Sequence, residues 1–397
     1  MSLNIVASSP SLELSGANVL VANLLDQFQR AGIQTDWIVT GHNPTDDAAW
    51  LGARQFKIHR LRLTRISDVQ QRQKMLVEFL EERAPCIYLP NFDFDMACAT
   101  PALSPANKVV LIMHCDDPVY YNFAARHGNL FNAIVCVSEF LAKKLGAAQP
   151  DFKGRIVHIP FGVAPPTELP AREKMPGQPL VVAYCGRISF HQKRVQDLAA
   201  IINQCYAENQ PVQFQIAGTG PDEKAFFETI KKPLAAGKVS RHGFLSNPAA
   251  LELLGKSDVI LMTSDFEGLP VVLLEAMSRG CVPVVTKTES GVGELVQSGE
   301  NGYMLSVGDV KSFAGVLAKL SADAALLSRL RQAAFERIIS SGFTLERAAA
   351  DYRKLFESLN EAKWHVERNG QPIIPGHYRL GSRIIKRFQA GFGVSQY

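Results

Sequence analysis

Apolar segments of strand length alternate with helical patterns along the chain. The helical patterns are amphipathic, as over residues 17–32, whereas the strands read as continuous apolar runs. Continuous apolar strands between helices are typical of parallel sheets that are covered by helices on both faces. In the first half of the chain the predicted strands cover residues 3–7, 35–40, 86–90, 108–114, 133–138 and 155–160.

A proline-rich stretch interrupts this alternation. Residues 161–179 carry five prolines and little apolar periodicity, which predicts a linker between two domains. The alternation then restarts, with predicted strands over residues 180–186, 212–218, 257–263 and 282–286. We therefore expect two doubly wound α/β domains. The expected segments are a first domain (1–163), a linker (164–179), a second domain (180–343), a long helix (344–365) and a basic tail (366–397).

Composition fits an ordinary globular enzyme, with 397 residues, 47% hydrophobic and 20% charged. No apolar run approaches the ~20 residues that a membrane-spanning helix needs. The N-terminus lacks the basic start and long apolar core of a signal peptide, and it predicts a strand. The seven cysteines are odd in number and unclustered, which favours buried thiols in a reducing cytoplasm over disulfides or metal ligands.

Basic residues are unevenly distributed although the net charge is only +4. Residues 57–65 form one basic stretch, and the tail forms another, where Glu367 is the only acidic residue from position 363 onward. The basic residues of that second stretch are Lys363, Arg368, Arg379, Arg383, Lys386 and Arg387. Both stretches could meet anionic lipid at the inner face of a membrane or an anionic acceptor, or could simply be solvated surface.

Two carboxylates, Glu267 and Glu275, lie eight residues apart in residues 264–286. Pro270 fits the first turn of a mostly apolar helix, so Glu275 is expected inside an apolar helix, where a carboxylate needs a partner. Glu267 precedes the helix, beside Gly268, where free N–H groups attract anions. This combination suits a ligand with hydroxyls and phosphates, such as a nucleotide sugar. The alternative is that Glu267 caps the helix and Glu275 pairs with an arginine.

Cations and glycines follow two predicted strands of the second domain. One strand ends at Gly186 and Arg187, and Lys193 lies six residues beyond Arg187. Arginine grips a phosphate through two N–H groups and lysine adds a point charge. The next strand leads to Gly218 and Gly220, which would allow a turn to approach a ligand closely. The alternatives are two surface cations and a plain strand-to-helix turn.

Polar residues also follow strands of the first domain. Gly16 lies in the sequence SGAN after the first strand, and His114 ends a later one. Asp116 or Asp117 could be a base for an acceptor, an assignment that stays open. The run FDFD, residues 92–95, superficially mimics a metal-binding Asp-x-Asp, but Asp93 and Asp95 are expected to cap a helix or contact an acceptor rather than bind metal.

The run from 264 to 286 resembles the Glu-x7-Glu signature of retaining glycosyltransferases of the GT-B fold, specifically glycosyltransferase family 4. Residues 289–309 continue the resemblance, which is strong over 180–310. It implies two Rossmann-like domains that face a central cleft, with a last helix that crosses back to the first domain. It also implies transfer of a sugar from a nucleoside diphosphate to an acceptor hydroxyl in glycan, polysaccharide or glycolipid synthesis, with no cofactor and no metal.

The resemblance implies roles for individual residues. Glu275 would bind the ribose. Glu267, with the Gly268 and Leu269 amides, would hold the sugar. Arg187 and Lys193 would stabilise the leaving diphosphate. The remaining implied donor-site residues are Gly16, Gly186, Gly218, Gly220, Arg241 and Phe244, the last two beside the base, and His114 joins Glu267, Arg187 and Lys193 as catalytic. On these roles Glu275→Gln should weaken nucleotide binding, and Glu267→Gln should spare it.

Two positions depart from the family pattern. Ser15 stands where the family often has the first of paired glycines, and Phe161 stands where it has an asparagine. Two rival functions remain. A nicotinamide-dependent oxidoreductase would need G-x-G-x-x-G after its first strand, which neither SGAN nor GTGP supplies. A non-catalytic protein that binds nucleotide sugars would keep the fold, and the retention of both carboxylates and both cations argues against it.

Overall fold

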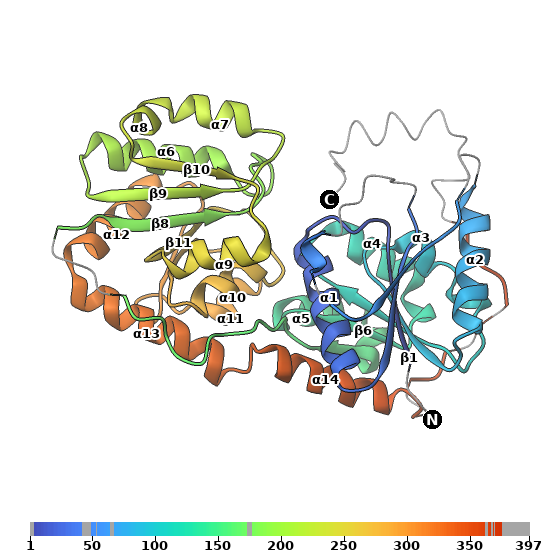
Figure 1. Cartoon of the computed structure of the whole chain (residues 1–397). Coiled ribbons are helices and arrows are strands. Elements are labelled where there is room, and N and C mark those ends of the chain that lie inside the picture. The colour runs from blue at the N-terminus through green and yellow to red at the C-terminus, as the bar shows by residue number, and fades with distance from the viewer. Residues whose placement is uncertain are drawn as a thin grey trace. The chain divides into compact units, whose positions relative to one another are not determined.

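The computed structural model describes residues 4–41, 49–52, 54–63, 67–172, 177–361, 364–366, 368 and 370–374. The chain divides into two compact units. The first unit comprises Met1–Val137, Leu141–Ile159 and Ala348–Tyr397, and the second comprises Ser138–Phe140 and Pro160–Arg347. Each unit contains one parallel sheet with helices against it (Figure 1).

The first unit has a seven-stranded sheet in the order β3-β2-β1-β4-β5-β6-β7. Its strands are β1 (Asn4–Ser9), β2 (Gln34–Val39), β3 (Lys57–Arg60), β4 (Cys86–Pro90), β5 (Lys108–Met113), β6 (Ala133–Cys136) and β7 (Ile156–His158). Its helices include α1 (Gly16–Arg30), α2 (Val69–Glu81), α3 (Phe94–Ala97), α4 (Pro118–His127) and α5 (Glu139–Ala148). The strand order reverses between β1 and β4, and ligands of such sheets bind at this switch point, outside the carboxyl ends of the strands.

The second unit has a six-stranded sheet in the order β10-β9-β8-β11-β12-β13. Its strands are β8 (Leu180–Cys185), β9 (Val212–Ala217), β10 (Val239–Gly243), β11 (Val259–Met262), β12 (Val282–Thr286) and β13 (Tyr303–Leu305). Its helices are α6 (Val195–Ala207), α7 (Glu223–Thr229), α8 (Lys231–Ala235), α9 (Asn247–Gly255), α10 (Val271–Met277), α11 (Val292–Leu295), α12 (Val310–Ala322) and α13 (Ala324–Ser340) among the described residues. Its strand order reverses between β8 and β11, so this sheet has a switch point of the same kind.

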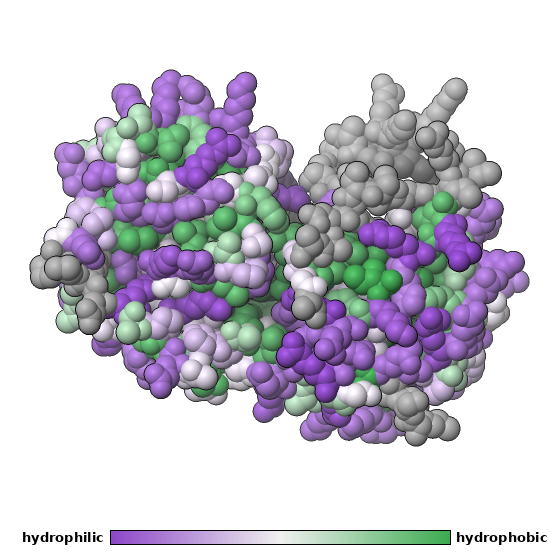
Figure 2. Space-filling model, in the orientation of Figure 1, coloured by the Kyte–Doolittle hydropathy of each residue, from purple (hydrophilic) through white to green (hydrophobic). Residues whose placement is uncertain are grey.

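A hydrophobic core lies between the second sheet and helices α6, α12 and α13. Leu198, Phe214, Phe313, Leu317 and Leu330 are buried in it. Hydrophilic side chains project at the top of the second unit, over α7 and α8 (Figure 2). The inward apolar faces of helices and strands explain why the alternation of patterns predicted this architecture.

The predicted fold class, two doubly wound parallel α/β domains, is confirmed. Each predicted strand overlaps an observed one. Three short edge strands, β3, β10 and β13, were not predicted because edge strands need no continuous apolar run: β3 exposes Lys57, Ile58 and Arg60. The helix expected from Pro270 begins one residue later, at Val271, with Pro270 in an extended conformation at the N-cap.

Hydrogen bonds attach the described part of the proline-rich stretch to the second unit. The Arg172 guanidinium donates hydrogen bonds to the main-chain oxygens of Gly255 (2.8 Å) and Leu254 (2.9 Å). Arg331 donates to the main-chain oxygen of Pro170 over 3.2 Å. This segment therefore packs on the amino-terminal edge of the second sheet, since Leu254 and Gly255 precede β11.

Helix α14 (Leu345–Ser358) enters the first unit at Ala348. There the Phe356 ring stacks on Phe28 of α1, with ring centroids 5.6 Å apart. Beyond the helix, Arg368 donates to the main-chain oxygens of Leu103 and Ser104. The amides of Gly370 and Ile373 also donate to the carbonyls of Pro101 and Cys98, each over 2.9 Å, which ties the chain beyond α14 to the first unit as far as Ile373. The other basic residues of the predicted tail lie outside the described residues.

Candidate functional site

Most residues of the predicted donor site follow strands of the second sheet. Because β8, β9, β11 and β12 are parallel, their carboxyl ends share one edge of the sheet. Gly186 and Arg187 follow β8, Gly218 and Gly220 follow β9, and Glu267 follows β11. The fold therefore brings these predicted residues to the edge where doubly wound sheets bind their ligands.

Lys193 and Glu267 are in direct contact. The Lys193 ammonium nitrogen lies 2.6 Å from Glu267 Oε1, and only 6% of Glu267 is exposed. The two loops that carry them are joined: the Asp265 amide donates to the Gln192 carbonyl (2.9 Å), and the Thr263 hydroxyl donates to the Lys193 carbonyl (2.8 Å). Two residues predicted to act separately on sugar and diphosphate thus form one partly buried ion pair.

The residues between Glu267 and α10 are part of a tight loop. The Gly268 carbonyl accepts a hydrogen bond from the Gly291 amide over 2.7 Å. A Cβ at Gly291 would lie 2.5 Å from that carbonyl oxygen, so glycine is needed for this close approach. Leu269 is 2% exposed and anchors the loop in the apolar interior. The loop that carries Glu267 is therefore held by the hydrogen bond to Gly291 and by the burial of Leu269.

Glu275 has an amide partner. Asn247 Nδ2 donates a hydrogen bond to Glu275 Oε1 over 2.8 Å. Arg279 donates to the main-chain oxygen of Glu275 (3.2 Å) rather than to its carboxylate. Burial raises the pKa of the Glu275 carboxyl above its ordinary value, while the Asn247 hydrogen bond and the Arg279 charge act to lower it. The partner that a carboxylate in an apolar helix needs is therefore Asn247, which the sequence analysis did not identify.

The glycines after β9 allow the turn that carries them to pack against a neighbouring loop. Gly218 has φ +136°, and a Cβ there would lie 1.8 Å from the Gly186 carbonyl oxygen. A Cβ at Gly220 would lie 2.2 Å from the Ile188 carbonyl oxygen. Both positions need glycine because the turn after β9 packs against the main chain after β8. What these glycines approach in the structure is the neighbouring loop, and their place beside a ligand stays a prediction.

The two residues predicted beside the base differ in their surroundings. The Arg241 guanidinium forms an ion pair with Glu223 and lies 4.5 Å from the centroid of the Phe227 ring. Phe244, just beyond β10, is 61% exposed. An exposed aromatic ring at a ligand-binding edge can stack on a planar ligand, whereas Arg241 is already engaged.

In the first unit, Gly16 is the first residue of α1. Ser15 is the N-cap, and its side-chain oxygen accepts a hydrogen bond from the Asn18 amide over 3.2 Å. The serine that departs from the family pattern thus supplies a helix cap. Gly16 lies after β1, at the carboxyl edge of the first sheet.

His114 follows β5 at the same edge and is buried. Its ring stacks on Phe92 with centroids 5.3 Å apart and planes 12° apart. Burial lowers the pKa of His114 to about 3. The imidazole is therefore neutral at physiological pH, and the residue can contribute hydrogen bonds but not a positive charge.

The aspartates of this edge are engaged in structural contacts. Asp116 accepts hydrogen bonds from the Tyr121 hydroxyl (2.6 Å) and the Lys144 ammonium (2.8 Å). Asp117 caps α4 by accepting from the Val119 amide over 2.8 Å. Their contacts favour structural roles over that of an acceptor base, the role that the sequence had left open.

Asp93 and Asp95 contact different partners. Asp93 is buried and accepts hydrogen bonds from the Ser8 and Thr40 hydroxyls, each over 2.7 Å. Asp95 lies 3.7 Å from Arg72. Within the described residues, no group of three His, Cys, Asp or Glu side chains is arranged to hold a metal ion.

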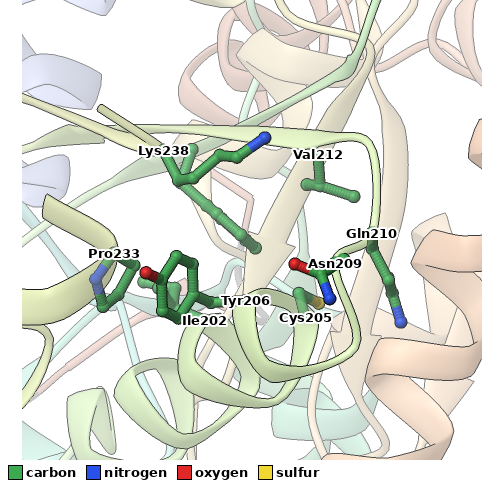
Figure 3. A pocket seen from close by; sticks show the side chains of 9 residues that line it. Ile202, Cys205, Tyr206, Asn209, Gln210, Val212, Pro233 and Lys238 are labelled. Atoms are coloured by element: carbon green, nitrogen blue, oxygen red, sulfur yellow. The ribbon is translucent and has the colours of Figure 1, made fainter. Parts of the chain in front are cut away.

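A small pocket opens at the opposite edge of the second sheet (Figure 3). Its lining includes Cys205 and Tyr206 at the end of α6, Val212 at the start of β9, and Lys238 just before β10. Its volume of about 90 Å³ is far below the several hundred Å³ of ligand sites in general. The pocket is therefore too small for the donor, whose site the sequence motifs predict at the other edge.

Residues 167–337 match the family described as glycosyl transferases group 1, which is nearly the whole second unit. The chain is 24% identical to the lipopolysaccharide 1,6-galactosyltransferase of Escherichia coli over 77% of its own length and 85% of that protein's. It is 30% identical to the N-acetyl-alpha-D-glucosaminyl L-malate synthase of Bacillus anthracis, over 41% of its own length and 42% of that protein's.

Solved structures of glycosyltransferases have a similar fold. The pneumococcal O-GlcNAc transferase GtfA, solved with UDP and GlcNAc, superposes with a TM-score of 0.73 over 90% of this chain and 99% of that one, at 11% identity. Anabaena HepE, solved with UDP, gives a TM-score of 0.72 over 90% of this chain and 100% of that one, at 16% identity. At such low identity these likenesses establish the fold.

The two Rossmann-like units and the matched motifs define a glycosyltransferase of the GT-B fold that uses a nucleotide sugar. Residues 167–337, within the second unit, belong to the glycosyl transferases group 1 family. The predictions of fold, family and enzyme class are thus confirmed. No helix in the described part of the chain is both long enough and apolar enough to cross a membrane.

Proposed function

We propose that this protein is a retaining hexosyltransferase that moves a sugar from a nucleoside diphosphate to an acceptor hydroxyl. The observation that carries the proposal is the partly buried contact between Lys193 and Glu267, at the strand edge where Arg187 also lies. The contact supports the proposal because the cation proposed for the diphosphate lies directly beside the carboxylate proposed for the sugar hydroxyls. Such adjacency is what a site needs when the bond to be broken joins a sugar to a phosphate.

The chemistry follows from where charge develops. As the glycosidic bond breaks, negative charge grows on the leaving diphosphate, and Arg187 and Lys193 stabilise it. Glu267 and the amides of Gly268 and Leu269 hold the sugar's hydroxyls. The leaving phosphate takes the proton of the acceptor hydroxyl, which attacks the same face of the sugar. The anomeric configuration is thereby retained, and no nucleophile of the protein is required.

The nucleoside is held by residues after β10 and on α10. Glu275 accepts hydrogen bonds from the ribose diol, and the exposed ring of Phe244 stacks on the base. Gly16 in the first unit contacts the donor phosphates. His114, neutral because burial lowers its pKa to about 3, hydrogen-bonds a sugar hydroxyl or presents its carbonyl to the developing positive charge.

The donor and the acceptor are proposed from chemistry and from relatives. GtfA and HepE were solved with UDP, so a UDP-sugar is the first donor to test. The galactosyltransferase relative acts on lipopolysaccharide by its name, which favours a cell-envelope glycan or glycolipid acceptor here. Lys57, Arg60 and Arg62 are exposed and could bring the enzyme to an anionic membrane surface that carries such an acceptor.

A panel of nucleotide sugars tests the proposal. The cognate donor should raise the melting temperature, since a ligand at a hundredfold excess over its dissociation constant stabilises by about 2.7 kcal/mol. Slow hydrolysis of that donor, followed by NMR, should release first the sugar anomer that the donor itself carries. Release of the opposite anomer would refute retention. Binding of a donor with neither hydrolysis nor transfer to any glycan acceptor would point to the non-catalytic alternative.

A further inference from the structure

Lys193, the cation proposed to bind the diphosphate, is already paired with an anion in the structure. Lys193 donates to Glu267 over 2.6 Å, and the Glu267 side chain is 8% exposed. A carboxylate so covered cannot swing into solvent when a ligand arrives. The Lys193 main chain is also fixed, because its carbonyl accepts from the Thr263 hydroxyl over 2.8 Å. The donor diphosphate must therefore share Lys193 with Glu267.

We infer that Glu267 is an internal counter-anion of Lys193 that weakens the hold of the site on the leaving nucleoside diphosphate and so speeds its release. The inference rests on the proposed contact between Lys193 and the diphosphate. Sequence reasoning gave Glu267 a role toward the sugar alone, which would leave nucleotide affinity unchanged in Glu267→Gln. The ion pair reverses that expectation.

Geometry allows the sharing. An ammonium group has three N–H donors, so one can remain on Glu267 while two turn to phosphate oxygens. Lys193 is then oriented by Glu267 before the donor binds, which reduces the ordering that binding requires. Its charge, however, is divided between two anions that repel each other across a partly buried site, where screening by water is weaker than in bulk solvent.

Repulsion by Glu267 acts more strongly on the product than on the donor. In a nucleotide sugar the terminal phosphate is a diester-like group with one negative charge. After transfer it is a terminal phosphate whose second proton dissociates near pH 6, so at pH 7 it carries most of a second charge. The same carboxylate that helps to bind the sugar therefore disfavours the diphosphate left behind. Release of product limits the rate of many enzymes, and this site carries a group that opposes its retention.

The test compares the affinity of free nucleoside diphosphate for wild-type protein and four variants by calorimetric titration at pH 7.5. Glu267→Gln removes the counter-anion and should raise affinity about tenfold, and Glu267→Ala, which removes the charge without adding an amide, should do the same. Glu267→Asp keeps the charge and should produce no gain. Asp265→Asn is the matched control: it removes a negative charge two residues away that pairs with Arg194 at 3.3 Å, and it should change affinity less than twofold.

A fifth variant, Lys193→Met, separates the proposed contact of Lys193 with the diphosphate from the inferred role of Glu267 as a counter-anion. If it leaves nucleoside diphosphate affinity unchanged, the proposed diphosphate contact is wrong, and the inference falls with it. If Lys193→Met weakens binding tenfold or more while Glu267→Gln and Glu267→Ala give no gain, the counter-anion is refuted and the proposed function stands. Equal gains in Glu267→Gln and Asp265→Asn would also refute it, because the effect would then be one of general charge.

Discussion

Asn247 donates a hydrogen bond to Glu275 Oε1 over 2.8 Å, and it joins two parts of the proposed nucleoside site. Asn247 begins α9, directly after the segment that carries the exposed Phe244, and Glu275 lies in α10. The hydrogen bond occupies one carboxylate oxygen and leaves the other for a ribose hydroxyl. It also favours the charged form of a carboxyl whose pKa burial raises.

Asn247→Ala should therefore weaken nucleoside diphosphate binding about tenfold, in line with the loss of one hydrogen bond to a charged group. The measurement is calorimetric titration at pH 7.5. Asn203→Ala is a suitable control, because Asn203 also donates from its side-chain amide, but to the Thr229 carbonyl and on an exposed surface. A loss of similar size in both variants would assign the effect to general destabilisation.

The affinity for nucleoside diphosphate should also depend on pH through Glu275. Ribose hydroxyls donate to the ionised carboxylate, so bound nucleotide lowers the pKa that burial raises in the free site. Affinity should be constant above the free-site pKa and should fall as the pH drops through it. Asn247→Ala removes an interaction that lowers this pKa, so the fall should begin at a higher pH. Glu275→Gln should weaken binding and abolish this pH dependence; identical profiles in wild type and Glu275→Gln would contradict the role.

The sequence predicted the architecture because buried strands and amphipathic helices carry local patterns. β5 was recognisable from its run of apolar residues, whereas β3, on the sheet edge with Lys57 and Arg60 exposed, was not. The motifs also indicated the family. Contacts between distant residues left no such trace: Lys193 and Glu267 are 74 positions apart, and Asn247 and Glu275 are 28 apart. Pairings of this kind depend on how the loops fold together, which spacing along the chain does not record.

Arg187→Ala should lower kcat/KM about 100-fold or more, the range for loss of one preorganised charge contact to a transition state. Lys193→Ala should do the same and should in addition lower the melting temperature, because it leaves the buried Glu267 without its cation. The neighbouring Arg194, which pairs with Asp197 at 2.7 Å, provides the control: Arg194→Gln should leave kcat/KM within about threefold of wild type, as expected for an ion pair that is partly open to solvent. Near-normal turnover in Arg187→Ala would remove that residue from the diphosphate site.

Transfer should proceed without a divalent ion, because two protein cations, Arg187 and Lys193, already meet the charge of the leaving diphosphate. Activity should therefore survive dialysis against excess EDTA, measured as sugar transfer or donor hydrolysis. Activity that vanished and returned on addition of manganese or magnesium would contradict this. The aspartates after β4, Asp93 and Asp95, would then be examined first.

Asp93 should make the stability of the first unit depend on pH. Its carboxyl group is buried beside the hydroxyls of Ser8 and Thr40, and burial raises its pKa from 3.8 to about 6. The fold thus favours the protonated form. Below about pH 4 the carboxyl is protonated in both folded and unfolded chains, and its full contribution to stability is present. As the pH rises from about 4 to about 6, the unfolded chain loses the proton first, so the folded state becomes less stable.

The expected loss over that interval is on the order of 3 kcal/mol, since each unit of pKa difference corresponds to about 1.4 kcal/mol. Asp93→Asn cannot titrate and should lack this part of the dependence, while its amide oxygen can still accept from Ser8 or Thr40. Denaturant unfolding at several pH values, followed by tryptophan fluorescence, measures it cleanly, because all three tryptophans (Trp37, Trp50 and Trp364) belong to the first unit. Asp95→Asn, which changes a partly exposed carboxylate near Arg72, should keep the wild-type slope. If Asp93→Asn and wild type lose stability in parallel between pH 4 and pH 6, Asp93 is ionised in the folded protein throughout, and burial does not govern it.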